Sequence, residues 1–169
     1  MPQDPSKPLD PSSIASDLNT LTINSQKLNR FTDELTVHVE QIESIVNDLN
    51  IGLRAFVIAE SLADEEHRSY HCIRLGYDKA GSEWGFTIDE FDEDARDPSN
   101  VANYQTWPFK EAPRALRLKV VDKIHELIKA LAKKSDEMAT QTAARAFLAK
   151  EIASSLSTPA PVQKTWGGK

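Results

Sequence analysis

Residues 14–49, with the sequence IASDLNTLTINSQKLNRFTDELTVHVEQIESIVNDL, carry an apolar side chain at every seventh position. The residues at this spacing are Ile14, Leu21, Leu28, Leu35, Ile42 and Leu49. A seven-residue apolar period is typical of an amphipathic helix that packs its stripe against another helix. We therefore predict a long helix over residues 24–49. Its extension back to residue 13 is interrupted by β-branched and capping residue types, which indicate a break near Asn24 and Ser25.

The apolar stripe of this helix is the first candidate for a functional surface. A helix of about 25 residues extends roughly 37 Å at 1.5 Å per residue, which is longer than a short sheet covers. Part of the stripe is therefore predicted to project beyond the rest of the domain and to pack on another helix, within the chain or in a homodimer. The residues predicted to form this assembly seam are Leu28, Phe31, Leu35, Ile42 and Leu49.

The apolar period changes after residue 52. Residues 53–59 and 70–75 are β-favouring runs, and the returning run alternates Trp84, Phe86 and Ile88 with polar or small residues. Residues 78–83 supply turn formers and Gly81 between the second and third runs. These features predict a small three-stranded antiparallel sheet with a hairpin and with one apolar face that needs cover.

The last third of the chain is predicted to be a loop followed by a long helix. Residues 92–109 combine acidic residues, Pro98 and an aromatic cluster, which favours a long loop. Pro113 suits the first turn of a helix, and an apolar stripe continues from Leu116 almost to Pro159. Residues 140–142 are predicted to bend or divide this helix. The expected fold class is α+β, with a long helix, a small sheet and a second long helix.

The chain is expected to form one domain with two tails. Residues 1–12 are rich in proline and carry almost nothing to bury, so we predict a disordered tail. Residues 13–157 form the predicted domain. Residues 158–169 follow a Pro-Ala-Pro stop and are predicted to be flexible, with Trp166 as an isolated aromatic side chain.

Composition and cysteine content exclude several classes of protein. The 169 residues carry a net charge of −6, which argues against global electrostatic capture of nucleic acid. Cys72 is the only cysteine, so an intrachain disulfide and a cysteine-based zinc site are excluded. The sequence has no apolar stretch long enough for a bilayer and no basic, apolar leader at its start. A cytoplasmic protein without membrane attachment is the expectation.

Charge is distributed unevenly along the chain. Residues 60–100 carry twelve acidic and four basic side chains, whereas residues 110–134 carry eight basic and three acidic ones. The helix after Pro113 is therefore a basic element in an acidic protein. Its predicted partner-binding basic face consists of Arg114, Arg117, Lys119 and Lys123, where charge would set the rate and specificity of docking.

Catalytic and metal-binding motifs are not recognisable in the sequence. His67 and His71 lie near a predicted strand, where four residues separate their side chains by roughly 13 Å. The acidic run 89–97 lacks the glycine and glutamate positions of an EF-hand loop. No metal ion, cofactor or catalytic residue is therefore predicted, although a small metal-dependent enzyme around these residues stays a third hypothesis.

The leading functional hypothesis is a non-enzymatic interaction module, such as an adaptor, accessory or inhibitor subunit. It would bind a protein partner or a second copy of itself through its amphipathic helices. The alternative is a protein that binds nucleic acid without sequence specificity, through the basic segment 110–134 and stacking by Trp107 or Trp166.

Overall fold

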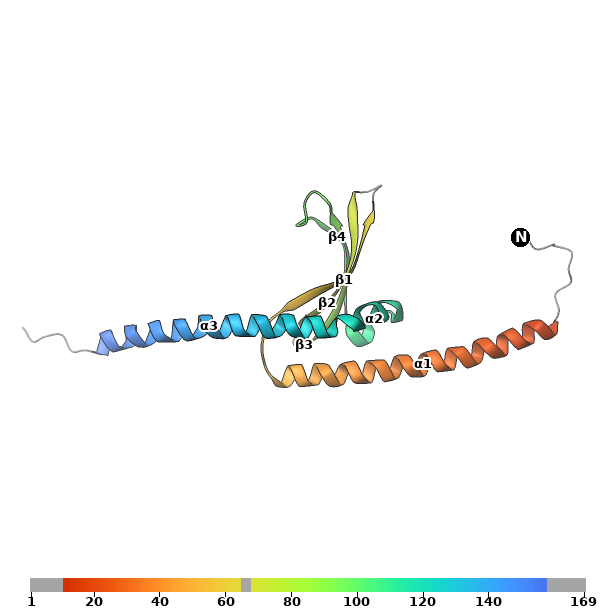
Figure 1. The fold of residues 1–169 in the computed structure, drawn as a ribbon, viewed down its shortest axis with the longest axis horizontal. Helices are drawn as coiled ribbons and strands as arrows, with labels where there is room; N and C mark the ends of the chain where they lie inside the picture. Colours follow the sequence, from red (N-terminus) through yellow and green to blue (C-terminus); the bar gives the residue numbers. More distant parts are fainter. Residues whose placement is uncertain (1–10, 65–67, 158–169) are drawn as a thin grey trace, which may run out of the picture.

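The computed structural model describes residues 11–64 and 68–157 and has an α+β fold (Figure 1). The elements are α1 (Pro11–Asp48), β1 (Ala55–Asp64), β2 (Ser69–Ala80), β3 (Glu83–Asp94), β4 (Val101–Pro108), the 3₁₀ turn η1 (Phe109–Glu111), α2 (Arg114–Val120), the 3₁₀ turn η2 (Val121–Lys123) and α3 (Ile124–Ser157). The long helix, antiparallel sheet and second long helix confirm the predicted order. Residues 1–10, His67 and the segment with Trp166 lie outside the described residues.

The sheet has four strands in the order β1-β2-β3-β4, so the prediction of three strands was wrong by one. The missed strand is β4, which pairs with β3 in the region predicted to be a loop. Tyr104 and Trp107 favour a β-strand, although the residues just before β4 are polar and resemble a loop. The predicted hairpin is present, but its turn contains only Gly81, with φ of 69°, and Ser82. The shorter turn lengthens both neighbouring strands.

The boundaries of the helices also differ from those predicted. α1 begins at Pro11 and continues through residues 24 and 25 without a break. Within this helix the hydroxyl of Thr22 donates to the carbonyl of Leu18 one turn earlier, at 2.8 Å. The helix after Pro113 is divided at η2, whereas α3 runs uninterrupted through residues 140–142.

The core lies between one face of the sheet and the helices. α1 contributes Val39 and Val46, and α3 contributes Leu127 and Leu131. The buried sheet and α2 side chains that meet them are Ala55, Ile73, Leu75, Tyr77, Phe86, Ile88, Leu116 and Val120. The burial of Phe86 and Ile88 confirms the predicted apolar face of their strand.

Polar contacts fix α1 to the β2–β3 hairpin at the edge of this core. The Tyr77 hydroxyl donates to Asn47 Oδ1 at 2.6 Å, and Asn47 Nδ2 donates to the Trp84 carbonyl at 3.1 Å. One turn earlier on α1, the Glu43 carboxylate accepts a hydrogen bond from the Phe86 amide at 2.5 Å. Because α1 is held by both apolar and polar contacts, its position on the sheet is well defined.

Burial raises the pKa of Glu43 above its ordinary value of 4.5, although the Phe86 amide acts in the opposite direction. A carboxyl group whose pKa is higher in the folded state destabilises the protein as the pH rises through that range. We expect Glu43→Gln, which can still accept from Phe86, to raise the free energy of unfolding at pH 7 by up to about 1 kcal/mol. The gain should vanish near pH 3, where Glu43 is neutral.

Urea unfolding at several pH values measures this effect. Exposed Glu111 provides the matched control, because Glu111→Gln removes the same charge without relieving burial. If the two substitutions changed the free energy of unfolding equally at every pH, burial of Glu43 would not make its ionisation costly.

Among the described residues, no helix combines the length and the apolar character needed to cross a membrane.

Candidate interaction surfaces

The predicted assembly seam is split in two by the fold. Leu35 and Ile42 pack against the core, so this part of the seam is closed within the chain. Leu28, Phe31 and Leu49 remain exposed at 46%, 54% and 66% of their surface. The exposed side chains are the part of the seam that is available to a partner.

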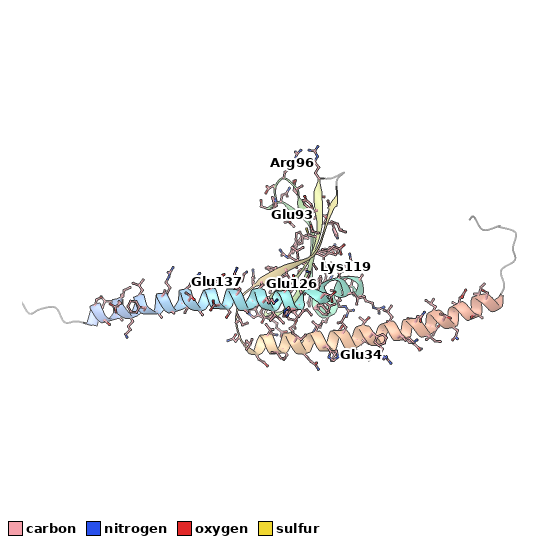
Figure 2. The ribbon with its side chains drawn as sticks, in the orientation of Figure 1. Glu34, Glu93, Arg96, Lys119, Glu126 and Glu137 are labelled. Atoms are coloured by element: carbon pink, nitrogen blue, oxygen red, sulfur yellow. The ribbon has the colours of Figure 1, made fainter. Side chains whose placement is uncertain are left out.

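Both long helices project far beyond the sheet, in opposite directions (Figure 1). They run in the same direction but are staggered, so the first half of α1 and the second half of α3 each lie alone. We call residues 13–31 of α1 the α1 arm and residues 135–156 of α3 the α3 arm. The side chains along both arms stand clear of the rest of the molecule in Figure 2.

The arms expose a large amount of apolar surface. On the α1 arm the exposed large apolar side chains are Ile14, Leu18, Leu21, Ile23, Leu28 and Phe31. On the α3 arm they are Met138, Phe147, Leu148, Ile152 and Leu156. Single exposed apolar residues are normal on a protein surface, but rows along a helix mark an interaction site.

Part of this apolar surface continues the helix face that packs on the core. In α1, Val46, Val39 and Thr32 are buried at heptad spacing, and the next steps of the same face reach Ser25 and Leu18. The neighbouring heptad row on this face leads from Leu35 to Leu28, Leu21 and Ile14. The arm therefore presents to solvent the face that the rest of the helix buries.

A groove of about 610 Å³ lies where the α3 arm begins. Its walls come from the end of α1, with Val46 and Leu49, and from α3, with Leu131, Ser135 and Ala139. Because α1 ends here while α3 continues, the groove opens onto the face of α3 that no longer has a neighbouring helix.

The predicted basic face is occupied by contacts within the chain. The guanidinium groups of Arg114 and Arg117 donate to Asn29 Oδ1 and Thr36 Oγ1 of α1, each at 2.6 Å. Lys119 pairs with Glu60 at 2.8 Å, and Lys123 pairs with Glu126 at 2.7 Å. The contacts of Arg114, Arg117 and Lys119 join α2 to α1 and β1. Lys123 of η2 instead pairs with its near neighbour in α3.

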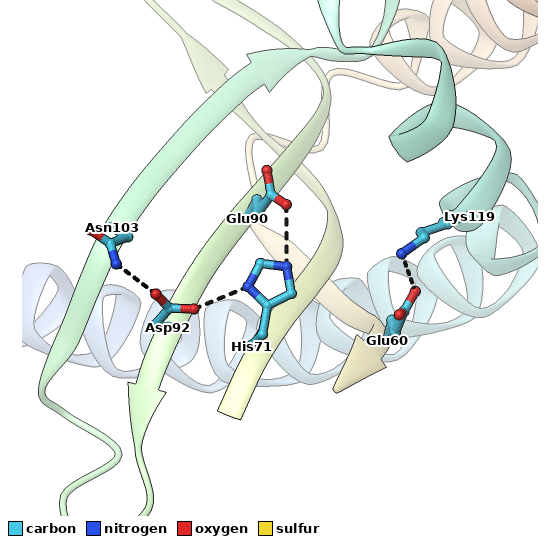
Figure 3. A network of polar contacts seen from close by, with 6 residues as sticks. All are labelled: Glu60, His71, Glu90, Asp92, Asn103 and Lys119. Carbon is cyan, nitrogen blue, oxygen red and sulfur yellow. Dashed lines mark hydrogen bonds and ion pairs between the residues drawn. The ribbon is translucent and has the colours of Figure 1, made fainter. Parts of the chain in front are cut away.

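His71 is held between two carboxylates on the sheet (Figure 3). Its Nε2 lies 3.2 Å from Glu90 and its Nδ1 lies 3.0 Å from Asp92, which also accepts a hydrogen bond from Asn103 at 2.6 Å. Sequence reasoning missed this pairing because it placed the acidic run in a loop. The signal was the hairpin register, which sets His71 opposite Asp92.

The His71 network does not have the arrangement of a metal site or a nucleophilic site. Within the described ranges, no group of three or more histidine, cysteine or acidic side chains is placed to hold a metal ion. Cys72 follows His71 on the strand and therefore points to the opposite face, where its sulfur lies 3.6 Å from Ser61 Oγ.

Comparisons with protein-family models, with curated proteins and with solved structures find no match to this chain. Its function is therefore inferred from its own geometry and chemistry.

Proposed function

We propose that this protein is a non-enzymatic interaction module that assembles through the α1 arm and the α3 arm. The observation that carries the proposal is the continuation of the core-packing face of α1 onto the α1 arm, together with the exposed apolar side chains of the α3 arm. The apolar side chains of this face are exposed in the structure, and we propose that another molecule covers them.

The energetics of bare helices support this proposal. An isolated helix of roughly 20 residues is marginally stable in water, because its stability comes mostly from packing of its apolar face. Burying a large apolar side chain contributes about 1.5–3 kcal/mol, so covering the half-exposed side chains of one arm would contribute several kcal/mol. Association that covers the arms would therefore also stabilise them as helices.

The polar clusters support a role in binding rather than in catalysis. His71 is engaged by Glu90 and Asp92, and the cations of α2 are engaged by their own chain. The exposed apolar side chains of the two arms, by contrast, are left uncovered in the described part of the chain.

Site-specific photocrosslinking in cells would test whether the arm face binds another molecule. A photoreactive phenylalanine analogue at position 21 should give a crosslinked product of higher mass, whereas the same analogue at Asn19, on the opposite face, should give much less. Crosslinking to any defined protein, including a second copy, would support the proposal. Absence of a product at position 21, or equal products at both positions, would contradict it.

A further inference from the structure

His71 on β2 has a carboxylate at each of its two ring nitrogens. Its Nδ1 lies 3.0 Å from Asp92 and its Nε2 lies 3.2 Å from Glu90, both on β3 (Figure 3). A neutral imidazole has one N–H donor and one lone pair, whereas an imidazolium has two donors. Only the protonated ring can therefore donate to both carboxylates at once. In the neutral ring, one of the two carboxylates faces a lone pair.

Asp92 extends this network to β4. Its carboxylate also accepts a hydrogen bond from Asn103 Nδ2 at 2.6 Å. Asn103 has a left-handed φ of 50° and lies where the pairing of β3 with β4 shifts, between Glu90 and Asp92. Beyond this shift, the Asp94 amide donates to the Asn100 carbonyl at 3.1 Å. The network therefore reaches from the imidazole ring to the outer end of β4.

The charged groups that surround His71 are mainly carboxylates. On the neighbouring strand β1, Glu60 is paired with Lys119 of α2 at 2.8 Å. Glu93 and Asp94 line the pocket beside the imidazole ring and add negative charge. The strand β4 carries no acidic or basic side chain. Loss of the His71 proton therefore leaves carboxylates that repel one another on this part of the sheet.

We propose that the proton on His71 fastens the outer end of β4 to the sheet, so that this end tightens at acid pH and loosens as the pH rises. Histidine side chains change charge between about pH 5 and 8, where carboxylates are generally ionised. The imidazolium form makes both contacts, so its stabilisation is present at the lower end of this range and is lost toward the upper end. This device is separate from the two arms and does not depend on the proposed function.

Amide hydrogen exchange of the full-length protein at about pH 5.5 and about pH 7.5 tests this proposal. After correction for the intrinsic exchange rate, protection of the Asp94 amide should fall about threefold between these values, in line with the modest strength of half-exposed ion pairs. The fall should be absent in His71→Gln, whose side chain has no proton to lose in this range. The Ile88 amide, in the buried middle of β3, reports any change in global stability, against which the fall at Asp94 is measured.

Two further variants locate the effect. His38→Gln removes an exposed histidine from α1 and should leave the fall at Asp94 intact. Asn103→Gly suits the left-handed backbone but removes the link to Asp92, so the fall should shrink. A fall in the wild type and in His38→Gln that disappears in His71→Gln would support the proposal. No fall in the wild type, an equal fall in His71→Gln, or an undiminished fall in Asn103→Gly would overturn it.

Discussion

Replacing Asp89 with alanine is expected to lower the free energy of unfolding by about 3–5 kcal/mol, because it leaves a largely buried guanidinium group without its anion. Asp89 lies on the face of the sheet opposite the helices and is only 1% exposed. Its carboxylate accepts hydrogen bonds from Arg74 Nε, at 2.6 Å, and from the Thr106 hydroxyl. Asp89 therefore links β2, β3 and β4 through a single side chain.

The environment of Arg74 makes this loss costly. Its guanidinium group lies 4.2 Å from the centre of the Phe56 ring and 5.0 Å from that of Phe91, and it donates to the Tyr104 hydroxyl at 3.1 Å. Burial acts to lower the pKa of Arg74, but the hydrogen bond and the charge of Asp89 outweigh it and raise that pKa above its ordinary value. A guanidinium group is so basic that Arg74 stays charged even when Asp89 is removed, and its charge is then poorly solvated.

Urea unfolding of two further variants separates the effect of breaking the Arg74–Asp89 ion pair from the effect of removing a negative charge. Asp122 is exposed on η2, so Asp122→Ala should change the free energy of unfolding by no more than about 0.5 kcal/mol. Replacing both partners, as Arg74→Met with Asp89→Leu, should recover a large part of the stability, since an apolar pair needs no compensation. If Asp89→Ala were as mild as Asp122→Ala, the ion pair would not be a major source of stability.

The position of Asp89 shows how far the sequence could predict the sheet. The apolar alternation of Trp84, Phe86 and Ile88 identified β3, but the acidic residues after it resembled a solvated loop. A two-residue turn pairs Ala80 with Glu83, and continuing that register places Arg74 opposite Asp89. The pair was therefore predictable once the turn was known to contain only two residues, but several turn formers in 78–83 favoured a longer one.

Other differences arise from contacts that local sequence does not reveal. β4 is mostly exposed and its pairing with β3 is interrupted between Glu90 and Asp92, so it lacks a buried alternating pattern. The break at η2 contains no glycine or proline, whereas residues 140–142, which resemble a break, are helical. Helix propensity alone is too weak to place such boundaries against tertiary packing.

The seam of α1 was predicted correctly as a helical stripe, but the heptad spacing does not tell which part the chain covers itself. Ile42 packs on the core. Leu21 occupies the same heptad position three heptads earlier and is 64% exposed. Coverage depends on where the sheet and α2 end, and that is a property of the whole fold. Ile42 and Leu21 therefore form a matched pair: both are large aliphatic residues on the same helix face, and they differ in whether the chain covers them.

Ile42→Asp is expected to lower the free energy of unfolding by about 3 kcal/mol or more, because it places an unpaired carboxylate against the apolar core. Leu21→Asp should change the unfolding of the body by less than about 0.5 kcal/mol, since the side chain lies in solvent. The measurement is urea unfolding followed by Trp84 and Trp107 fluorescence, at a concentration low enough to keep the chain monomeric. Equal destabilisation by the two variants would mean that the α1 arm folds back onto the body. A large effect confined to Ile42 would show that one heptad stripe closes the core at one end and leaves the other end uncovered by its own chain.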